Sequence, residues 1–160
     1  MRNVILGTGC YQNVKSGNTV SITGDGGNAW GYYRPSYKKL APSLKLYQYY
    51  RDNPDNLNDV ELIEYYINDY YHHRLEKLNV YELLYEFKNS FDEDIILLCH
   101  ELPSDCDIIT KQHFCHRRLV ADYVELTTGI VIPEISVDQN CIIITHQQPD
   151  YKPMLKKLMR

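Results

Sequence analysis

The chain has 160 residues, enough for one domain with a sizeable hydrophobic core. Hydrophobic residues make up 44% of it and charged residues 24%, the ordinary balance of a soluble globular protein. The formal net charge of −4 argues against a broad, sequence-blind grip on a phosphate backbone, although it leaves room for a local basic patch.

Apolar runs and cysteines set further limits. No apolar run approaches the roughly 20 residues of a membrane span, and no charged-then-apolar signal segment opens the chain. The five cysteines are an odd number without regular spacing, so we expect no disulfide framework. We therefore expect a cytoplasmic protein without a membrane partner, whose thiols are free or bind a metal.

Two short strands and a glycine-rich turn are predicted near the N-terminus. Residues 3–6 form a β-like run that Gly7 and Gly9 end, and residues 19–23 alternate polar and apolar side chains as a strand does. Three glycines in the turn at residues 24–28 permit close backbone approach, so the turn either binds a ligand or is a plain connection. Asp25 is its one side chain that could carry chemistry.

An aromatic and basic segment follows over residues 30–50. Arg34 lies there among tyrosines, and basic residues among aromatics can stack on and clamp a base or a single strand. The alternative is a loop whose tyrosines cover the core with their hydroxyls in water. Of all segments in the chain, this one is the best candidate for a lid or recognition loop.

Residues 43–87 are predicted to form a helical, tyrosine-rich insert after the second strand, because 12 of the 15 tyrosines lie between Tyr32 and Tyr85. Ser43 is expected to cap a first helix, Asn58 a long second one with Glu61 at the capping-box position, and residues 79–87 to form a third. The predicted buried stripe of the long helix is Val60, Ile63, Ile67, Tyr71, Leu75 and Leu78. The neighbouring His72 and His73 would point about 100° apart, so we expect both at the surface.

Reactive side chains gather in residues 95–125. A short apolar run there is predicted to be a buried strand that delivers Cys99 and Glu101 at its end. After a polar loop, Cys115, His116 and Arg117 open a predicted helix that ends at residue 129. A strand end and a helix N-terminus therefore converge, and this end of an open α/β sheet is where ligands usually bind.

Two β-like runs and a tail complete the chain. Residues 130–132, stopped by Pro133, and residues 141–145 are predicted strands, and residues 151–160 are predicted to form a short amphipathic helix. Strands that alternate with helices predict a single α/β domain over residues 1–160. We expect a small, mostly parallel sheet flanked by helices, with the insert as a cap beside it.

The pattern Leu97-Leu98-Cys99-x-Glu101, followed by Cys115-His116-Arg117 at the start of a helix, resembles the bacterial and phage family catalogued as domain of unknown function 488. The resemblance extends over residues 20–135, and these two short motifs are its most specific part. Relatives often carry an Arg- or Pro-containing turn after the early strand, where this chain has glycines. The resemblance implies the fold and the location of the site; the family has no agreed activity.

The residue types at the helix start suggest chemistry. Free N–H groups and the helix dipole favour an anion, and Arg117 would add a bidentate charge for phosphate or carboxylate. Cys115 would have a lowered pKa and could be a thiolate nucleophile, while His116 could be an acid, a base or a second donor. Glu101 is the natural partner, either in an ion pair with Arg117 or as a general base or nucleophile.

Two other interpretations remain open. In the structural one, Glu101 and Arg117 form a buried salt bridge, and Cys99 and Cys115 are small core residues. In the other, zinc is held by side chains of suitable type but irregular spacing: Cys99, Cys106, His113 and Cys115 or His116.

We assign no metal ligand and predict two groups of site residues. The predicted catalytic residues are Glu101, Cys115 and His116, and the predicted ligand-binding residues are Cys99, Arg117, Asp25 and Arg34. The expected partner is a small anionic ligand or a nucleotide; the net charge disfavours nucleic acid without excluding it. The chain would be a hydrolase or transferase acting on a nucleotide-like substrate, or else a non-catalytic module that binds a nucleotide or a protein.

Overall fold

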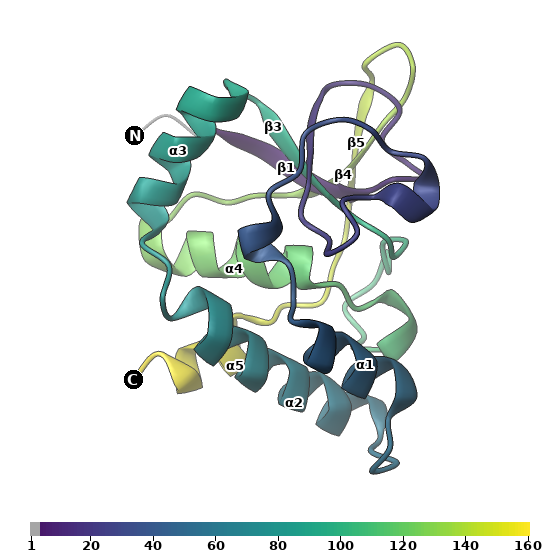
Figure 1. Ribbon diagram of the computed structural model, residues 1–160, viewed down its shortest axis with the longest axis vertical. Coiled ribbons are helices and arrows are strands. Elements are labelled where there is room, and N and C mark those ends of the chain that lie inside the picture. The colour runs from purple at the N-terminus through teal and green to yellow at the C-terminus, as the bar shows by residue number, and fades with distance from the viewer. Residues whose placement is uncertain (1–3) are drawn as a thin grey trace.

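A five-stranded sheet organises the chain in the computed structural model, which describes residues 4–160 (Figure 1). The strands are β1 (Ile5–Cys10), β2 (Asn18–Ser21), β3 (Ile95–Cys99), β4 (Glu134–Val137) and β5 (Ile143–His146), in the order β2-β3-β1-β4-β5. The first four in this order are parallel, and β5 pairs antiparallel with β4. The predicted small, mostly parallel α/β sheet flanked by helices is confirmed.

Five α-helices accompany the sheet: α1 (Leu44–Asp52), α2 (Asp59–Tyr70), α3 (Val80–Phe91), α4 (His116–Thr128) and α5 (Lys152–Leu158). Figure 1 shows α4 next to the sheet, with α1, α2 and α5 in a further layer beyond α4. The helical insert therefore extends the molecule under α4. None of the helices in residues 4–160 is long and apolar enough to cross a membrane.

The two faces of the sheet are covered differently. Along β3, Ile95, Leu97 and Cys99 belong to the large core shared with the helices. The alternate residues Ile96 and Leu98 belong to a small second cluster on the other face. There the cover is loop rather than helix, because residues 11–17 return across this face from the end of β1 to the start of β2.

The prediction that the first strand ends at Gly7 is wrong, because β1 continues to Cys10. The glycines lie inside the strand where other chain segments approach closely. A Cβ at Gly9 would lie 2.6 Å from Val14 Cγ2 and 2.8 Å from the Ile135 carbonyl oxygen. Glycine here serves close packing rather than a turn.

We expect Gly9→Ala to lower the free energy of unfolding by about 1–3 kcal/mol, because the added methyl group overpacks this contact. Gly24→Ala is the matched control: its Cβ would meet nothing within 4 Å, and its φ is not positive. Urea unfolding of both variants measures the difference. Equal stability of the two variants would contradict the packing argument.

Helix starts follow the predicted capping residues. Ser43 Oγ accepts from Leu46 N, and Asn58 and Glu61 form a complete capping box at α2. The predicted stripe of the long helix is wrong at Val60, which is 44% exposed, and the buried side of α2 is Leu62, Ile63, Tyr66, Ile67 and Tyr70. A π-helical turn (Tyr71–Leu75) follows α2 and shifts the helical phase, which a uniform period of 3.6 residues misses.

Smaller predictions have mixed outcomes. His72 and His73 are at the surface, as expected, where each lies beside an acidic side chain four residues away. The strand predicted at residues 130–132 is wrong, because β4 starts only after Pro133. The Pro133 carbonyl accepts from Thr8 N at 2.9 Å, a ladder bond that proline can make, so Pro133 marks the entrance to the strand and not its end.

Candidate functional site

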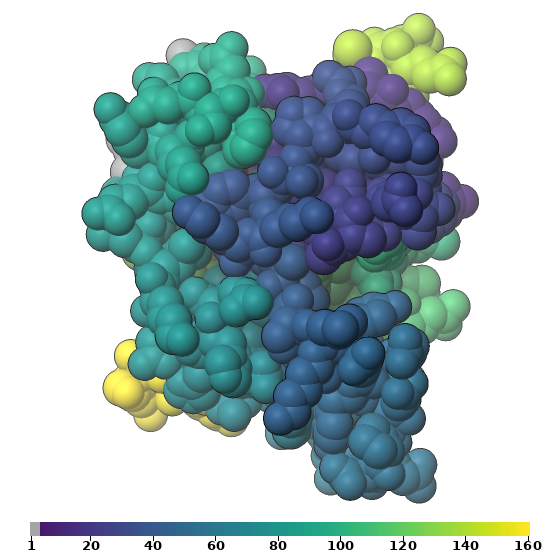
Figure 2. Space-filling model, in the orientation of Figure 1, coloured from purple at the N-terminus to yellow at the C-terminus, as the bar shows by residue number. Residues whose placement is uncertain are grey.

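A cavity of about 540 Å³ lies where β3 ends and α4 begins. Its lining combines aromatic and apolar walls with a polar floor: Thr23, Gly24, Asp25, Pro42, Leu44, Tyr47, Tyr50, Tyr66, Cys99, His100, Glu101, Phe114, Cys115 and His116. Figure 2 shows the predicted recognition segment, in dark blue, across the middle of one face of the molecule. Leu44 and Tyr47 from this segment are 69% and 48% exposed, so they form the rim of the cavity.

The structure brings Cys99, Cys115 and His116 together. Cys99 is the last residue of β3, Cys115 is the N-cap of α4 and His116 is its first residue, and all three are buried. Imidazole Nε2 donates to the Ile22 carbonyl oxygen at 2.7 Å, which leaves Nδ1 facing the two cysteines. Nδ1 lies 3.3 Å from the Cys99 sulfur and 3.8 Å from the Cys115 sulfur.

The pKa values of the Cys99 and Cys115 thiols are shifted in opposite directions. Burial opposes ionisation of Cys115, but a hydrogen bond from Cys99 and the charges of Arg117 and His116 outweigh it and hold the pKa of Cys115 well below its ordinary value. Burial, and then the neighbouring Cys115, raise the pKa of Cys99 well above its ordinary value. These surroundings favour ionisation of Cys115 over ionisation of Cys99, with the Cys99 thiol as the hydrogen-bond donor to the Cys115 sulfur.

Glu101 also lies on the floor of the cavity, but its pKa is shifted upward, whereas that of Cys115 is shifted downward. Burial, the negative charge of Cys115 and a hydrogen bond with that thiolate raise the pKa of Glu101 to about 9. The carboxyl group is thus neutral at physiological pH and can donate a proton. A thiolate and a carboxylic acid lie in contact, both predicted from the sequence as catalytic residues.

Cys99, Cys115 and His116 also have the residue types of a zinc site, with ligand atoms within 4.8 Å of one another. Their arrangement does not fit one. The Cys99 sulfur lies 3.3 Å from Nδ1 and 3.5 Å from Nε2, so it sits over the imidazole ring. An ion bound to Nδ1 lies in the ring plane, and its sulfur ligand would be much farther from Nε2 than from Nδ1.

The other residues of the zinc hypothesis lie elsewhere. Cys106 Sγ contacts the Ile108 carbonyl oxygen at 3.9 Å, and His113 Nδ1 contacts the Leu102 carbonyl oxygen at 3.3 Å. Neither side chain lines the cavity. All five cysteines are unpaired.

Arg117 is fully buried and does not line the cavity. Its Nε and Nη2 donate to both carboxylate oxygens of Glu134, with Nη2 2.7 Å from Oε2. The predicted ion pair between Arg117 and Glu101 is wrong, because Glu101 offers Arg117 only its main-chain carbonyl oxygen, at 2.7 Å. Arg117 therefore acts on Cys115 through its charge and is not placed to hold a phosphate group in this cavity.

Sequence reasoning missed Glu134. The signal was a carboxylate inside an apolar strand, with Ile132 and Ile135 on either side of the Pro133-Glu134 pair, and such a carboxylate needs a buried cation.

Asp25 reaches the cavity through the glycine-rich turn. Burial opposes its ionisation, but hydrogen bonds from Thr23 Oγ1 and from the Gly27 and Ala29 N–H groups lower its pKa to about 2. Its carboxylate also lies 3.4 Å from His100 Nε2. The Asp25 carboxylate is therefore ionised at neutral pH, and its hydrogen bonds hold the glycine-rich turn in its conformation.

Sequence reasoning assigned no role to His100. Its Nδ1 accepts from Trp30 Nε1 at 2.6 Å, so His100 links the wall of the cavity to the recognition segment.

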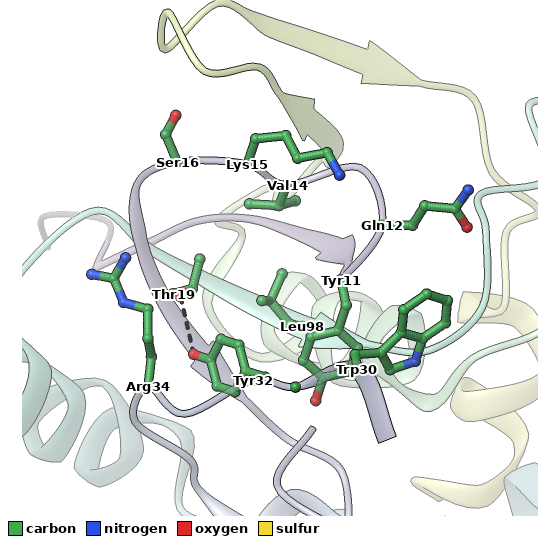
Figure 3. A pocket seen from close by; sticks show the side chains of 11 residues that line it. Tyr11, Gln12, Val14, Lys15, Ser16, Thr19, Trp30, Tyr32, Arg34 and Leu98 are labelled. Carbon is green, nitrogen blue, oxygen red and sulfur yellow. Dashed lines mark hydrogen bonds between the residues drawn. The ribbon is translucent and has the colours of Figure 1, made fainter. Parts of the chain in front are cut away.

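Arg34, the remaining predicted ligand-binding residue, does not line this cavity. It is exposed and borders a separate cavity of about 350 Å³, together with Lys15 (Figure 3).

Comparison of the chain with protein-family models, curated proteins and solved structures gives no match. The resemblance to the domain of unknown function 488 therefore stays a prediction.

Proposed function

We propose that this chain is a hydrolase or transferase that attacks a nucleotide-like substrate with Cys115. One observation carries the proposal: Cys115 and Glu101 touch on the floor of the cavity, and their surroundings displace their pKa values in opposite directions. Groups displaced in this way are typical of a nucleophile and its acid in an active site. Cys115 is buried and Glu101 half-buried, and the limited access of water strengthens their interaction.

The proposed reaction has two steps. The Cys115 thiolate attacks an electrophilic carbon of the substrate, and Glu101 gives its proton to the leaving group. Water, or an acceptor hydroxyl in a transferase, then attacks the same carbon, releases the thiolate and returns a proton to the Glu101 carboxylate. Cys99 and His116 are positioning residues in this scheme, since both contact the thiolate.

The walls indicate which part of a nucleotide would enter. The rings of Tyr50, Tyr66 and Phe114 contact one another with centroids 4.9–5.7 Å apart in tilted and edge-to-face arrangements, and they form an apolar wall. No lysine or arginine is among the lining residues, whereas two carboxyl groups are. This composition favours an uncharged planar ring or sugar inside the cavity, with any phosphate outside it.

Alkylation by iodoacetamide tests the nucleophile. We expect Cys115 to react faster than Cys10, which lies buried in β1, and to keep its rate about two pH units below the free-thiol pKa near 8.5. Cys99→Ala should slow this reaction at low pH by removing the hydrogen bond to the thiolate, whereas Cys10→Ala should not. Site-resolved mass spectrometry gives the rates.

Protection by ligands tests the substrate class. Nucleosides should slow the alkylation of Cys115 and raise the melting temperature by mass action, while inorganic phosphate alone should do neither. If Cys115 reacts only after denaturation, it is not a nucleophile. If nucleosides protect an unreactive Cys115, the cavity is a binding module without catalysis.

A further inference from the structure

A second cavity lies on the loop-covered face of the sheet (Figure 3). Its volume is about 350 Å³, and its lining residues on the sheet include Thr19 and Leu98. Leu98 precedes Cys99 on β3, so the two cavities lie on opposite faces of the same strand end. The second cavity belongs to no step of the reaction proposed above.

Aromatic rings with fixed orientations form one wall of this cavity. The hydroxyl of Tyr32 is hydrogen-bonded to Thr19 Oγ1 at 3.0 Å, as Figure 3 shows. The hydroxyl of Tyr11 is hydrogen-bonded to Thr23 Oγ1 at 2.9 Å. Trp30 donates its indole N–H to His100 Nδ1. Because the polar ends of all three side chains are already bonded, what they offer a ligand is the apolar ring surface.

Two cations stand beside these rings. Lys15 comes from the loop that crosses the sheet and Arg34 from the recognition segment, and Figure 3 shows them on different sides of the cavity. Both side chains are exposed, and within residues 4–160 neither forms an ion pair or a side-chain hydrogen bond. The lining contains no aspartate or glutamate. Unlike the first cavity, the second therefore has a net positive lining.

We propose that this second cavity is a binding site for an aromatic phosphate of the nucleoside monophosphate class. The base would stack on the aromatic wall, and the phosphate would be held by one of the two cations that flank this wall, Lys15 or Arg34. The cavity is large enough for a ligand of this size. The inference does not rest on the function proposed for Cys115, because the two cavities have separate linings.

Ligand binding at the second cavity would affect the first cavity through a short chain of side-chain contacts. Trp30 lines the second cavity and holds His100, which lines the first. The ring of Tyr11 also lies 5.4 Å from that of His100, centroid to centroid. A ligand that moves Trp30 would therefore move His100 as well.

Trp30 is the only tryptophan of the chain, so its fluorescence reports on this site. Titration with AMP or UMP should give a saturable change, and uridine or inorganic phosphate alone should bind at least tenfold more weakly. Lys15→Gln/Arg34→Gln should weaken AMP binding at least tenfold. The matched control Lys156→Gln/Lys157→Gln changes two exposed cations on α5 and should bind as the wild type does.

A further variant separates the two cavities. Leu44→Glu places a negative charge at the rim of the first cavity and should leave the Trp30 titration unchanged while it abolishes nucleoside protection of Cys115. The proposal is overturned if AMP gives no fluorescence change, if Lys15→Gln/Arg34→Gln binds like its control, or if inorganic phosphate or uridine binds as tightly as AMP. Equal melting temperatures of the two double variants would show that folding is not the cause.

Discussion

Glu134→Ala is expected to lower the free energy of unfolding by about 3–5 kcal/mol, the usual effect of removing one partner from a buried ion pair. Arg117 and Glu134 are both fully buried, and the variant would leave the guanidinium without its counter-charge. Thr8 Oγ1 also donates to Glu134 Oε1, at 2.7 Å, and would lose its acceptor. Urea unfolding near neutral pH measures the loss.

Two controls define what the loss means. Arg117→Met/Glu134→Leu removes both charges and should recover most of the stability, because a buried pair contributes little more than apolar residues of similar size. Asp52→Ala breaks an ion pair with Arg51 in which both side chains are more than half exposed, and should leave stability unchanged. A Glu134→Ala variant as stable as Asp52→Ala would show that the ion pair does not form.

The second large effect is a dependence of stability on pH that appears only after mutation. In the unfolded chain near pH 7, Glu101 is a carboxylate and Cys115 a thiol; in the folded chain Glu101 holds the proton and Cys115 is the thiolate. Both states bind the same number of protons, so these two residues leave wild-type stability flat with pH. Folding moves a proton from sulfur to oxygen.

Cys115→Ser removes one side of this exchange. Burial still raises the pKa of Glu101 above that of an unfolded carboxyl, so its stabilising contribution is complete below about pH 4.5 and is lost as the pH rises through the folded pKa. The free energy of unfolding should fall by up to about 1.4 kcal/mol per pH unit in that window. Urea unfolding from about pH 5 to pH 8 measures this slope.

Glu101→Gln is the mirror-image control. The lowered pKa of Cys115 then makes stability rise with pH until the unfolded thiol also ionises. Flat profiles in both single variants would mean that neither residue is shifted, and would remove the proposed acid and nucleophile together.

How far the sequence predicts this molecule depends on the range of each interaction. Ser43, Asn58 and Asn79 cap their helices as expected, because a cap is settled within three residues of the chain. Cys99 and Cys115 meet as expected, since a strand end and a helix start must converge in an open α/β sheet.

Residues with distant partners could not be predicted in the same way. Arg117 follows Cys115 and His116 in a pattern that suits an anion, yet the buried Glu134 takes its guanidinium. Gly7 and Gly9 look like a turn because the segments that press on them, around Val14 and Ile135, are placed by the fold and not by local sequence. Periodicity and capping carry no information about such pairings.

The position of β3 between β1 and β2 has a consequence for the order of folding during synthesis. The two N-terminal strands are neighbours in the sequence but do not pair with each other; each pairs with β3. Until Ile95–Cys99 has left the ribosome, both have unpaired edges, and neither cavity has its floor. We therefore expect nascent chains shorter than this to be protease-sensitive, and neither cavity to form before β3 is available.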